Sequence, residues 1–374
     1  MSALPLSLYV HFPWCVRKCP YCDFNSHPAK GPLPEDTYVE QLLRDLDADL
    51  VLADGRAIGT IFLGGGTPSL FSGRAIATLL DGVRARATLA TGVEITLEAN
   101  PGAIDEAHFV AYRSAGVNRL SIGAQSFDAT QLRALGRIHE PGDIERAFAA
   151  ATRAGFERVN LDLMHGLPGQ SAGDAREDLE RAIALGPSHL SWYQLTIEPR
   201  TEFALHPPTL PGEDALEAIE CAGFDLLASA GYERYEVSAF ARCGHRAQHN
   251  VNYWTFGDYI GIGAGAHGKV TLDSTIVRTK KPPAPSRYLG TDAHALRDTM
   301  PIDDDALAGE FMLNALRLID GVEPALFEAR TGRSIETIEP TWRRLRELGL
   351  MRADRLAVTA TGLRYLDSVV SEFL

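Results

Sequence analysis

Three cysteines near the start of the chain have the spacing of metal-cluster ligands. Cys15, Cys19 and Cys22 follow one another as C-x3-C-x2-C, and no fourth cysteine lies close behind them. Clusters of the [4Fe–4S] type are normally held by four cysteine thiolates. Three thiolates would leave one iron without a protein ligand, and an open metal position can bind a substrate or cofactor directly. We therefore predict a [4Fe–4S] cluster with one iron open to a small molecule.

The same cysteines allow two other interpretations. They could belong to a zinc site completed by His11 or His27. Disulfide pairing is less favoured, because the chain has an odd number of cysteines and the apolar run Ser7–Val10 is too short for a secretory signal. Reduced thiols without a targeting segment predict a cytoplasmic protein. Cys221 and Cys243 have no paired spacing, so we interpret them as ordinary thiols.

Length and charge exclude several classes of protein. The 374 residues are enough for one large domain and a smaller one. The formal net charge of −13 argues against general nucleic-acid binding, which depends on Lys and Arg side chains that neutralise phosphates. No stretch approaches the ~18 to 20 apolar residues that span a bilayer. We therefore expect neither a membrane span nor a nucleic-acid partner.

The elements that must position the cysteines alternate along the chain. Short apolar runs predict strands, and amphipathic stretches such as 38–46 predict helices between them. This alternation predicts an α/β fold with a parallel sheet and helical crossovers. Six units are too few for a closed eight-fold barrel, so we expect a partial (βα)6 barrel. The predicted strands are Ser7–Val10, Thr60–Leu63, Glu94–Glu98, Arg119–Gly123, Arg158–Leu163 and His189–Leu195.

We divide the chain into three parts. Residues 1–240 are predicted to form the partial barrel, and 241–300 contain an HNxxYW motif, a glycine-rich segment and a proline-rich linker. Residues 301–374 are predicted to form a small C-terminal domain that resembles a winged helix. Acidic residues outnumber basic residues in this domain, which disfavours DNA binding. We expect it to pack against the barrel or a partner protein.

Polar residues and glycines fall at the ends of the predicted strands. The turn Gly64–Thr67 would let the backbone approach a ligand closely, because glycine has no Cβ atom. A carboxylate such as Asp162 in an apolar strand is costly without a partner. Each of these residues alone could be a helix cap or part of a surface ion pair. Their coincidence at strand ends instead predicts a binding site, because ligands bind at the carboxyl ends of such strands.

These motifs resemble those of radical S-adenosylmethionine proteins. The resemblance extends over nearly the whole chain to the oxygen-independent coproporphyrinogen III oxidase group. It implies that S-adenosylmethionine binds the open iron, with Glu98 at the methionine end, Gln125 and Asp162 at the ribose, and Arg137 at a carboxylate. The positions that match the group's cofactor contacts are Tyr9, Gly65, Gly66, Thr67, Glu98, Gln125, Arg137 and Asp162.

Two departures from the oxidases indicate a different branch of the group. Phe24 stands where the oxidases have a further cysteine, and Cys15 comes too early for their long N-terminal extension. Both departures are typical of the haem chaperone HemW branch. The motif His249–Trp254, which reads H-N-x-x-Y-W, and the glycine-rich segment Ile260–Gly268 also match that branch.

The resemblance implies a haem chaperone that passes haem to apo-haem proteins, in particular respiratory ones. It would act as a monomer or a homodimer, and it could contact a membrane-bound recipient. His249 is a candidate haem ligand and His267 a second one, since imidazole is a common axial ligand. The alternative for His249 is a hydrogen-bonded residue packed by Tyr253 and Trp254.

Two other functions stay open. One is the oxidase reaction, in which a radical decarboxylation converts propionates of coproporphyrinogen III to vinyl groups. The other is a winged-helix regulator with a redox cluster, which the acidic charge disfavours. The sequence assigns no catalytic residue.

Overall fold

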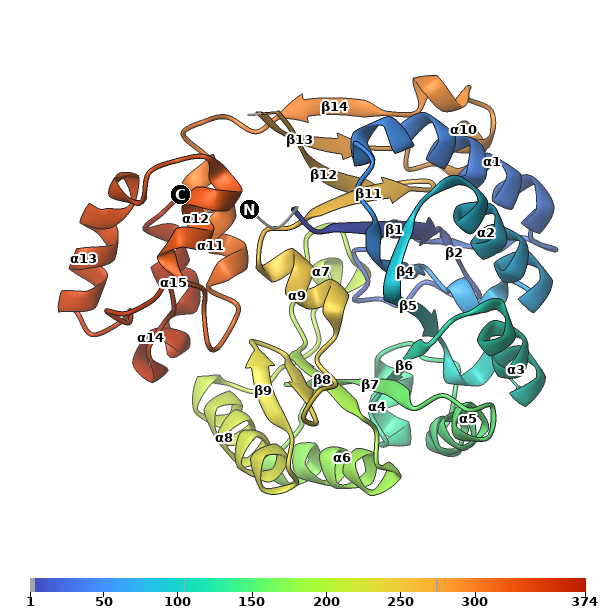
Figure 1. Cartoon of the computed structure of the whole chain (residues 1–374). Helices are drawn as coiled ribbons and strands as arrows, with labels where there is room; N and C mark the ends of the chain where they lie inside the picture. Colours follow the sequence, from blue (N-terminus) through green and yellow to red (C-terminus); the bar gives the residue numbers. More distant parts are fainter. Residues whose placement is uncertain (1–3, 104, 274) are drawn as a thin grey trace.

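The computed structural model describes residues 4–103, 105–273 and 275–374. Within these residues, twelve strands form one curved sheet in the order β14-β13-β12-β11-β1-β4-β5-β6-β7-β8-β10-β9 (Figure 1). Its central run is parallel and consists of β11 (Asp258–Ile262), β1 (Leu6–Phe12), β4 (Ile58–Gly65), β5 (Leu89–Ala99), β6 (Arg119–Gln125), β7 (Arg158–His165) and β8 (His189–Gln194).

Antiparallel strands extend this run at both edges. On one side β8 is followed by β10 and β9, and on the other side β11 is followed by β12, β13 and β14. Their bounds are β9 (Glu233–Glu236), β10 (Ala239–Ala241), β12 (His267–Leu272), β13 (Thr275–Lys280) and β14 (Asp298–Pro301). The sequence segment 241–300 therefore contributes strands to the same sheet as the first half of the chain.

The predicted partial barrel is confirmed. Each of the six predicted strands overlaps one of β1, β4, β5, β6, β7 and β8. Helices lie between consecutive strands and cover the outer, convex face of the sheet, while the inner face stays open on one side (Figure 1). The covering helices are α1 (Glu35–Asp49), α2 (Gly73–Arg86), α3 (Glu106–Ala115), α5 (Pro141–Arg153), α6 (Ala172–Leu185) and α8 (Glu213–Ser229).

The two faces of the parallel strands differ in chemistry. In β1, Leu8 and Val10 belong to the apolar core under the helices. Successive side chains of a strand point to opposite faces, so Ser7 and Tyr9 face inward, where the hydroxyl of Ser7 lies 2.7 Å from that of Thr60. The barrel interior is therefore polar and can hold ionisable side chains.

The C-terminal residues form a second unit with its own apolar core. Its helices α11 (Leu307–Ala315), α12 (Pro324–Thr331) and α13 (Glu339–Glu347) are followed by the antiparallel bridge Met351↔Val358, and Val322 pairs with Leu356. Three helices and a small β wing follow one another in the order that the predicted winged-helix-like domain requires. The unit lies at the open side of the barrel (Figure 1) and ends with α14 (Ala360–Arg364) and α15 (Leu366–Ser371).

Shorter helices complete the fold. Among the described residues, no helix combines the length and apolar character that crossing a bilayer requires. The remaining α-helices are α4 (Ala129–Ala134), α7 (Glu202–Leu205), α9 (Gln248–Trp254) and α10 (Pro285–Leu289).

A buried ionic network fastens the proline-rich segment to α1. The ammonium group of Lys281 lies 2.5 Å from a carboxylate oxygen of Asp45 and 2.8 Å from one of Asp49, and these three side chains are fully buried. Asp45 also accepts hydrogen bonds from the Tyr288 hydroxyl and the Gly263 amide. Burial raises the pKa of Asp45 even though Lys281 lies beside it. The network thus fixes the turn at 263 relative to α1.

We expect Lys281→Met to lower the free energy of unfolding by about 3–5 kcal/mol, because removal of one partner leaves buried charge uncompensated. The adjacent Lys280 is the matched control, since its pair with Asp298 is half exposed. Lys280→Met should lower the free energy of unfolding by at most about 1 kcal/mol. Urea unfolding of the two variants checks this prediction, and equal losses would contradict it.

Candidate functional site

The cysteine loop is clamped at its base. Cys15 ends β2 (Trp14–Cys15), which pairs with β3 (His27–Pro28) on the far side of the loop. The Trp14 ring packs edge-on against Tyr38, with 4.8 Å between the ring centroids. Within the loop, the Cys22 amide donates a hydrogen bond to the carbonyl of Cys19. The three thiols therefore project from a segment whose two ends are fixed.

Asn25 ties the same loop to a distant part of the chain. Its side-chain amide donates hydrogen bonds of 2.9 Å to the carbonyls of Ala264 and Pro283. A Cβ atom on Gly265, which has a φ of +82°, would lie 2.1 Å from the Asn25 side chain. Only glycine fits at this contact. The turn after β11 therefore supports the loop that carries the cysteines.

Each thiol has a polar neighbour. The Thr67 hydroxyl donates to the Cys15 sulfur at 3.5 Å, the Ser26 hydroxyl lies 3.8 Å from the Cys22 sulfur, and Arg137 Nη1 lies 3.8 Å from the Cys19 sulfur. Burial raises the pKa of Cys15 and Cys22. Hydrogen-bond donors beside the sulfurs favour the thiolate form that metal binding requires.

The geometry does not favour the zinc alternative. Both ring nitrogens of His11 are engaged, Nδ1 with the Tyr9 hydroxyl and Nε2 with the Asn25 carbonyl. His27 Nε2 lies 3.3 Å from the Asn25 side-chain oxygen. Neither histidine is directed to the thiols.

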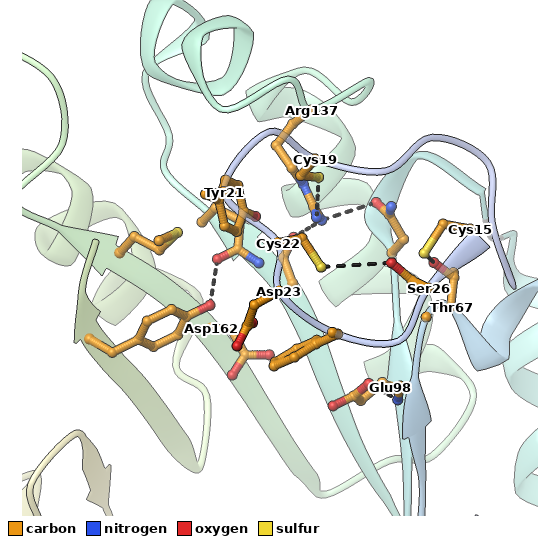
Figure 2. A pocket seen from close by; sticks show the side chains of 18 of the residues that line it. Cys15, Cys19, Tyr21, Cys22, Asp23, Ser26, Thr67, Glu98, Arg137 and Asp162 are labelled. Carbon is orange, nitrogen blue, oxygen red and sulfur yellow. Dashed lines mark hydrogen bonds between the residues drawn. The ribbon is translucent and has the colours of Figure 1, made fainter. Parts of the chain in front are cut away.

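The carboxyl ends of the strands meet the cysteine loop at one cavity of about 410 Å³. Figure 2 shows the cysteine loop above the strands that carry Glu98 and Asp162. Of the positions predicted to hold the cluster and S-adenosylmethionine, Tyr9 alone does not line this cavity but a neighbouring one. The predicted residues that line the first cavity are Cys15, Cys19, Cys22, Gly65, Gly66, Thr67, Glu98, Gln125, Arg137 and Asp162.

Two carboxylates in this cavity have no cationic partner among the described residues. Glu98 accepts a hydrogen bond of 3.0 Å from the Gly65 amide, and Asp162 accepts bonds of 2.8 Å from Ser121 and Asn160. Desolvation, together with the charge of Asp162, raises the pKa of Glu98 to about 8, and desolvation also raises that of Asp162. A cationic ligand would relieve this cost, so the cavity suits a positively charged molecule.

Gln125 and Arg137 are held in defined positions. Gln125 ends β6 with a φ of +67°, a conformation that is uncommon for a residue with a side chain. Its side-chain carbonyl accepts a hydrogen bond from the Tyr193 hydroxyl. Arg137 donates to the Gly123 carbonyl at 2.8 Å, and its buried Nε has no hydrogen-bond partner among the described residues. Arg137 therefore links the cysteine loop to β6.

A second cavity, of about 710 Å³, adjoins the first. The two cavities share Asp23, Phe24, Gly65 and Glu98. Its walls come from the cysteine loop, β1, β4, β5, α9, the strands β11 to β13 and α11, and seven of the seventeen lining residues are Phe, Tyr or Trp. The aromatic side chains beyond the shared wall are Tyr9, Phe62, Tyr253, Trp254, Phe256 and Tyr259.

The structure does not bring His249 to either cavity. Its Nδ1 lies 3.2 Å from a carboxylate oxygen of Glu94, and its ring packs against Phe62 at 4.4 Å between centroids. Burial lowers the pKa of this imidazole. The motif instead supplies Tyr253 and Trp254 to the second cavity, which His267 also lines.

Some residues that line the two cavities were not predicted from the sequence. Tyr193 at the end of β8 and Glu198 beyond it line the first cavity, and the rule that ligands bind at strand ends could have found them. Tyr259 and Arg278 line the second cavity from β11 and β13. The glycine-rich segment Ile260–Gly268 overlaps β11 but does not predict a strand, and no motif covers β13.

We expect Glu98→Gln to stabilise the ligand-free protein at alkaline pH. The folded protein retains a proton that the unfolded chain releases, because the pKa of this carboxyl is about 8 in the fold against an ordinary 4.5. Wild-type stability should therefore fall as the pH rises from 4.5 to 8, by up to about 1.4 kcal/mol per pH unit.

Urea unfolding at a series of pH values checks this prediction. The free energy of unfolding of Glu98→Gln should not show the fall that titration of Glu98 causes in the wild type. The exposed control Glu177→Gln should show the same pH dependence as the wild type. Parallel curves for the wild type and Glu98→Gln would contradict the assignment.

Comparison with known proteins agrees with this geometry. The sequence model of the Radical SAM superfamily matches residues 9–182. The solved structure of coproporphyrinogen III oxidase (HemN) from Escherichia coli superposes with a TM-score of 0.83, over 99% of this chain and 90% of that chain, at 23% sequence identity. This likeness shows that the fold is shared.

Curated relatives match over almost the whole chain. The Heme chaperone HemW of Escherichia coli (strain K12) is 52% identical over 99% of this chain and 98% of its own length. The Heme chaperone HemW of Haemophilus influenzae is 45% identical with the same coverage. The bovine mitochondrial Radical S-adenosyl methionine domain-containing protein 1 is 35% identical over 98% of this chain and 87% of its own. The chain therefore belongs to the Heme chaperone HemW family of the radical SAM superfamily.

Proposed function

We propose that this protein is a haem chaperone, which binds haem and passes it to apo-haem proteins. The observation that carries the proposal is the aromatic cavity of about 710 Å³ beside the cysteine cavity. Aromatic walls suit a large planar apolar ring, and most of a bound ligand's surface is buried in such cavities. The names of the relatives, which are 52% and 45% identical, support the same function.

The family's cofactors are a [4Fe–4S] cluster and S-adenosylmethionine. In this chain Cys15, Cys19 and Cys22 would hold the cluster, and the donors beside their sulfurs fit that role, because hydrogen bonds to the sulfurs tune such clusters. When bound, the two cofactors supply one-electron and radical chemistry. The protein's part is to fix the three thiolates and to leave one coordination position open.

The strand ends fit S-adenosylmethionine by charge. This cofactor carries an ammonium and a sulfonium group, and Glu98 and Asp162 are desolvated carboxylates without a cationic partner. We assign Glu98 to the methionine end, Asp162 and Gln125 to the ribose hydroxyls, and Arg137 to a carboxylate. The remaining proposed contacts are Tyr9, Gly65, Gly66 and Thr67.

Gly66 supports this assignment by its packing. A Cβ atom there would lie 2.6 Å from the Trp14 carbonyl, so the backbone of this turn can approach the cysteine loop only with glycine. The Gly66 amide donates to the Phe12 carbonyl at 2.7 Å. The turn and the loop therefore form one wall, against which a cofactor could lie in contact with both.

The rival function is oxidation of coproporphyrinogen III, which the fold shared with HemN favours. Phe24 bears on the choice, because it stands at the position of the oxidases' additional cysteine and lies in the wall between the two cavities. A phenyl ring there cannot supply a thiol. We therefore favour the chaperone.

The proposal also covers the cellular compartment of the protein and the protein that receives the haem. Five free thiols, two of them exposed, fit a reducing compartment such as the cytoplasm. The proposed recipient is an apo-haem protein of respiration, which would receive haem from the second cavity by direct contact.

Cys19→Ser should abolish cluster assembly, because two thiolates cannot hold a cluster that is open at only one iron. Iron and sulfide content and the brown absorption after anaerobic reconstitution measure the loss. Cys221→Ser, which changes an exposed thiol outside the loop, is the control and should keep the cluster. Full iron and sulfide in Cys19→Ser would contradict the ligand assignment.

Reconstituted wild-type protein should bind haemin saturably and pass it to apomyoglobin faster than free haemin reaches that acceptor. With reductant, S-adenosylmethionine and coproporphyrinogen III, it should form no protoporphyrinogen, while an authentic oxidase does so under the same conditions. Mass spectrometry of the tetrapyrroles gives the second result. Catalytic product would establish the oxidase, and absence of saturable haemin binding would overturn the chaperone.

A further inference from the structure

We infer that His267 is the axial ligand to the iron of haem bound in the second cavity. This inference rests on the proposed haem chaperone function and goes beyond it by assigning the residue that holds the cargo. His267 begins β12 and lines the cavity near its junction with the cysteine loop. Few other side chains that line this cavity could bind haem iron.

The cavity offers five side chains that could ligate haem iron. Among the residues that the structure describes, no cysteine or methionine lines it. Iron in haem is otherwise bound by histidine or, in some proteins, by a tyrosine phenolate. The candidates among the described residues are Tyr9, His11, Tyr253, Tyr259 and His267.

Four of these candidates are unsuited. His11 uses both ring nitrogens in hydrogen bonds, one of them to the hydroxyl of Tyr9. Burial raises the pKa of Tyr9, Tyr253 and Tyr259, so that their phenolate forms are disfavoured. Each of them would have to lose a proton in an apolar setting before it could bind iron.

His267 has none of these restrictions. Its side chain is exposed at the cavity wall, and no hydrogen bond joins its ring to another described residue. Desolvation and the positive charges of Arg278 and Lys280 lower its pKa. The imidazole is therefore neutral at physiological pH, which is the form that ligates haem iron.

The turn that presents His267 is rigid. The Gly263 amide donates to Asp45, the Ala264 amide to the Tyr38 hydroxyl, and the Ala266 carbonyl accepts from the Lys281 amide. These contacts join the turn to the buried ionic network of α1. A ligand-bearing segment that is already ordered loses little conformational entropy when cargo binds.

The same face of the edge strands carries positive charge. Lys269 lies two residues after His267 in β12, and Arg278 is its register partner in β13. Both cations are ion-paired, Lys269 with Asp258 and Arg278 with Glu310, but Lys269 is buried, whereas the Arg278 side chain is 37% exposed. Arg278 is therefore the cation that a propionate of haem can reach while His267 holds the iron.

The assignment also explains the placement of His249. Because Glu94 and Phe62 enclose it, its role is to hold α9 in the barrel, so that Tyr253 and Trp254 form the cavity wall. His249→Gln, which can keep a hydrogen bond to Glu94, should therefore leave iron ligation intact.

The test compares haemin complexes of the reconstituted wild-type protein with those of His267→Ala, His249→Gln and the surface control His294→Ala. Resonance Raman spectra excited in the haem Soret band of the reduced complexes report the iron–imidazole stretch. We expect this band to be lost in His267→Ala alone, with haemin affinity lowered by about tenfold or more. Added imidazole should restore the iron–imidazole band and the wild-type absorption spectrum in that variant.

The outcomes separate this inference from the function on which it rests. An iron–imidazole band retained in His267→Ala, or lost in His249→Gln while the cluster and S-adenosylmethionine binding stay intact, would overturn the ligand assignment and leave the chaperone standing. A wild-type protein without saturable haemin binding would overturn the function itself. Cluster content of each variant shows whether it has folded.

Discussion

The position of β1 between β4 and β11 is the constraint on which both cavities depend. β1 pairs in parallel with each neighbour, so the three strands end at the same edge of the sheet. The cysteine loop follows β1, the glycine turn follows β4, and the turn that leads to His267 follows β11. Pairing of three distant segments therefore places the thiols, the cofactor turn and the proposed haem ligand side by side.

Several groups in the site have an unfavourable free energy, which stabilising contacts elsewhere in the structure must offset. Two desolvated carboxylates, Glu98 and Asp162, and the left-handed conformation of Gln125 all lie around one cavity. Strain of this kind persists only where the surroundings over-determine the structure. Here the apolar core beneath the helices and the buried network around Lys281 provide that support at a distance. The cavity can therefore keep groups that only a bound ligand would satisfy.

Local patterns in the sequence predicted the central part of this arrangement. Six strands were visible as apolar runs, and residues such as Glu98 and Asp162 could be placed at the functional edge, because parallel strands share one edge. The antiparallel strands β9, β10, β12, β13 and β14 were not predicted, since strands of three to six residues carry little periodic signal.

The role of His249 could not be read from its motif either. A motif gives residue types, whereas the partner that decides this role, Glu94, lies 155 positions earlier. The same holds for Asn25, whose contacts to Ala264 and Pro283 join segments more than 200 positions apart. Such pairings depend on the finished sheet, and no local spacing encodes them.

Because the two cavities share a wall, the binding equilibria of their two ligands are linked. Glu98 and Phe24 face both spaces, so a cation that settles beside Glu98 changes the charge and solvation met by a molecule on the other side. Binding free energies are linked reciprocally, and each occupant must alter the affinity for the other by the same factor. Any effect that an occupant of the smaller cavity has on binding in the larger one is therefore matched, in sign and in size, by the reverse effect.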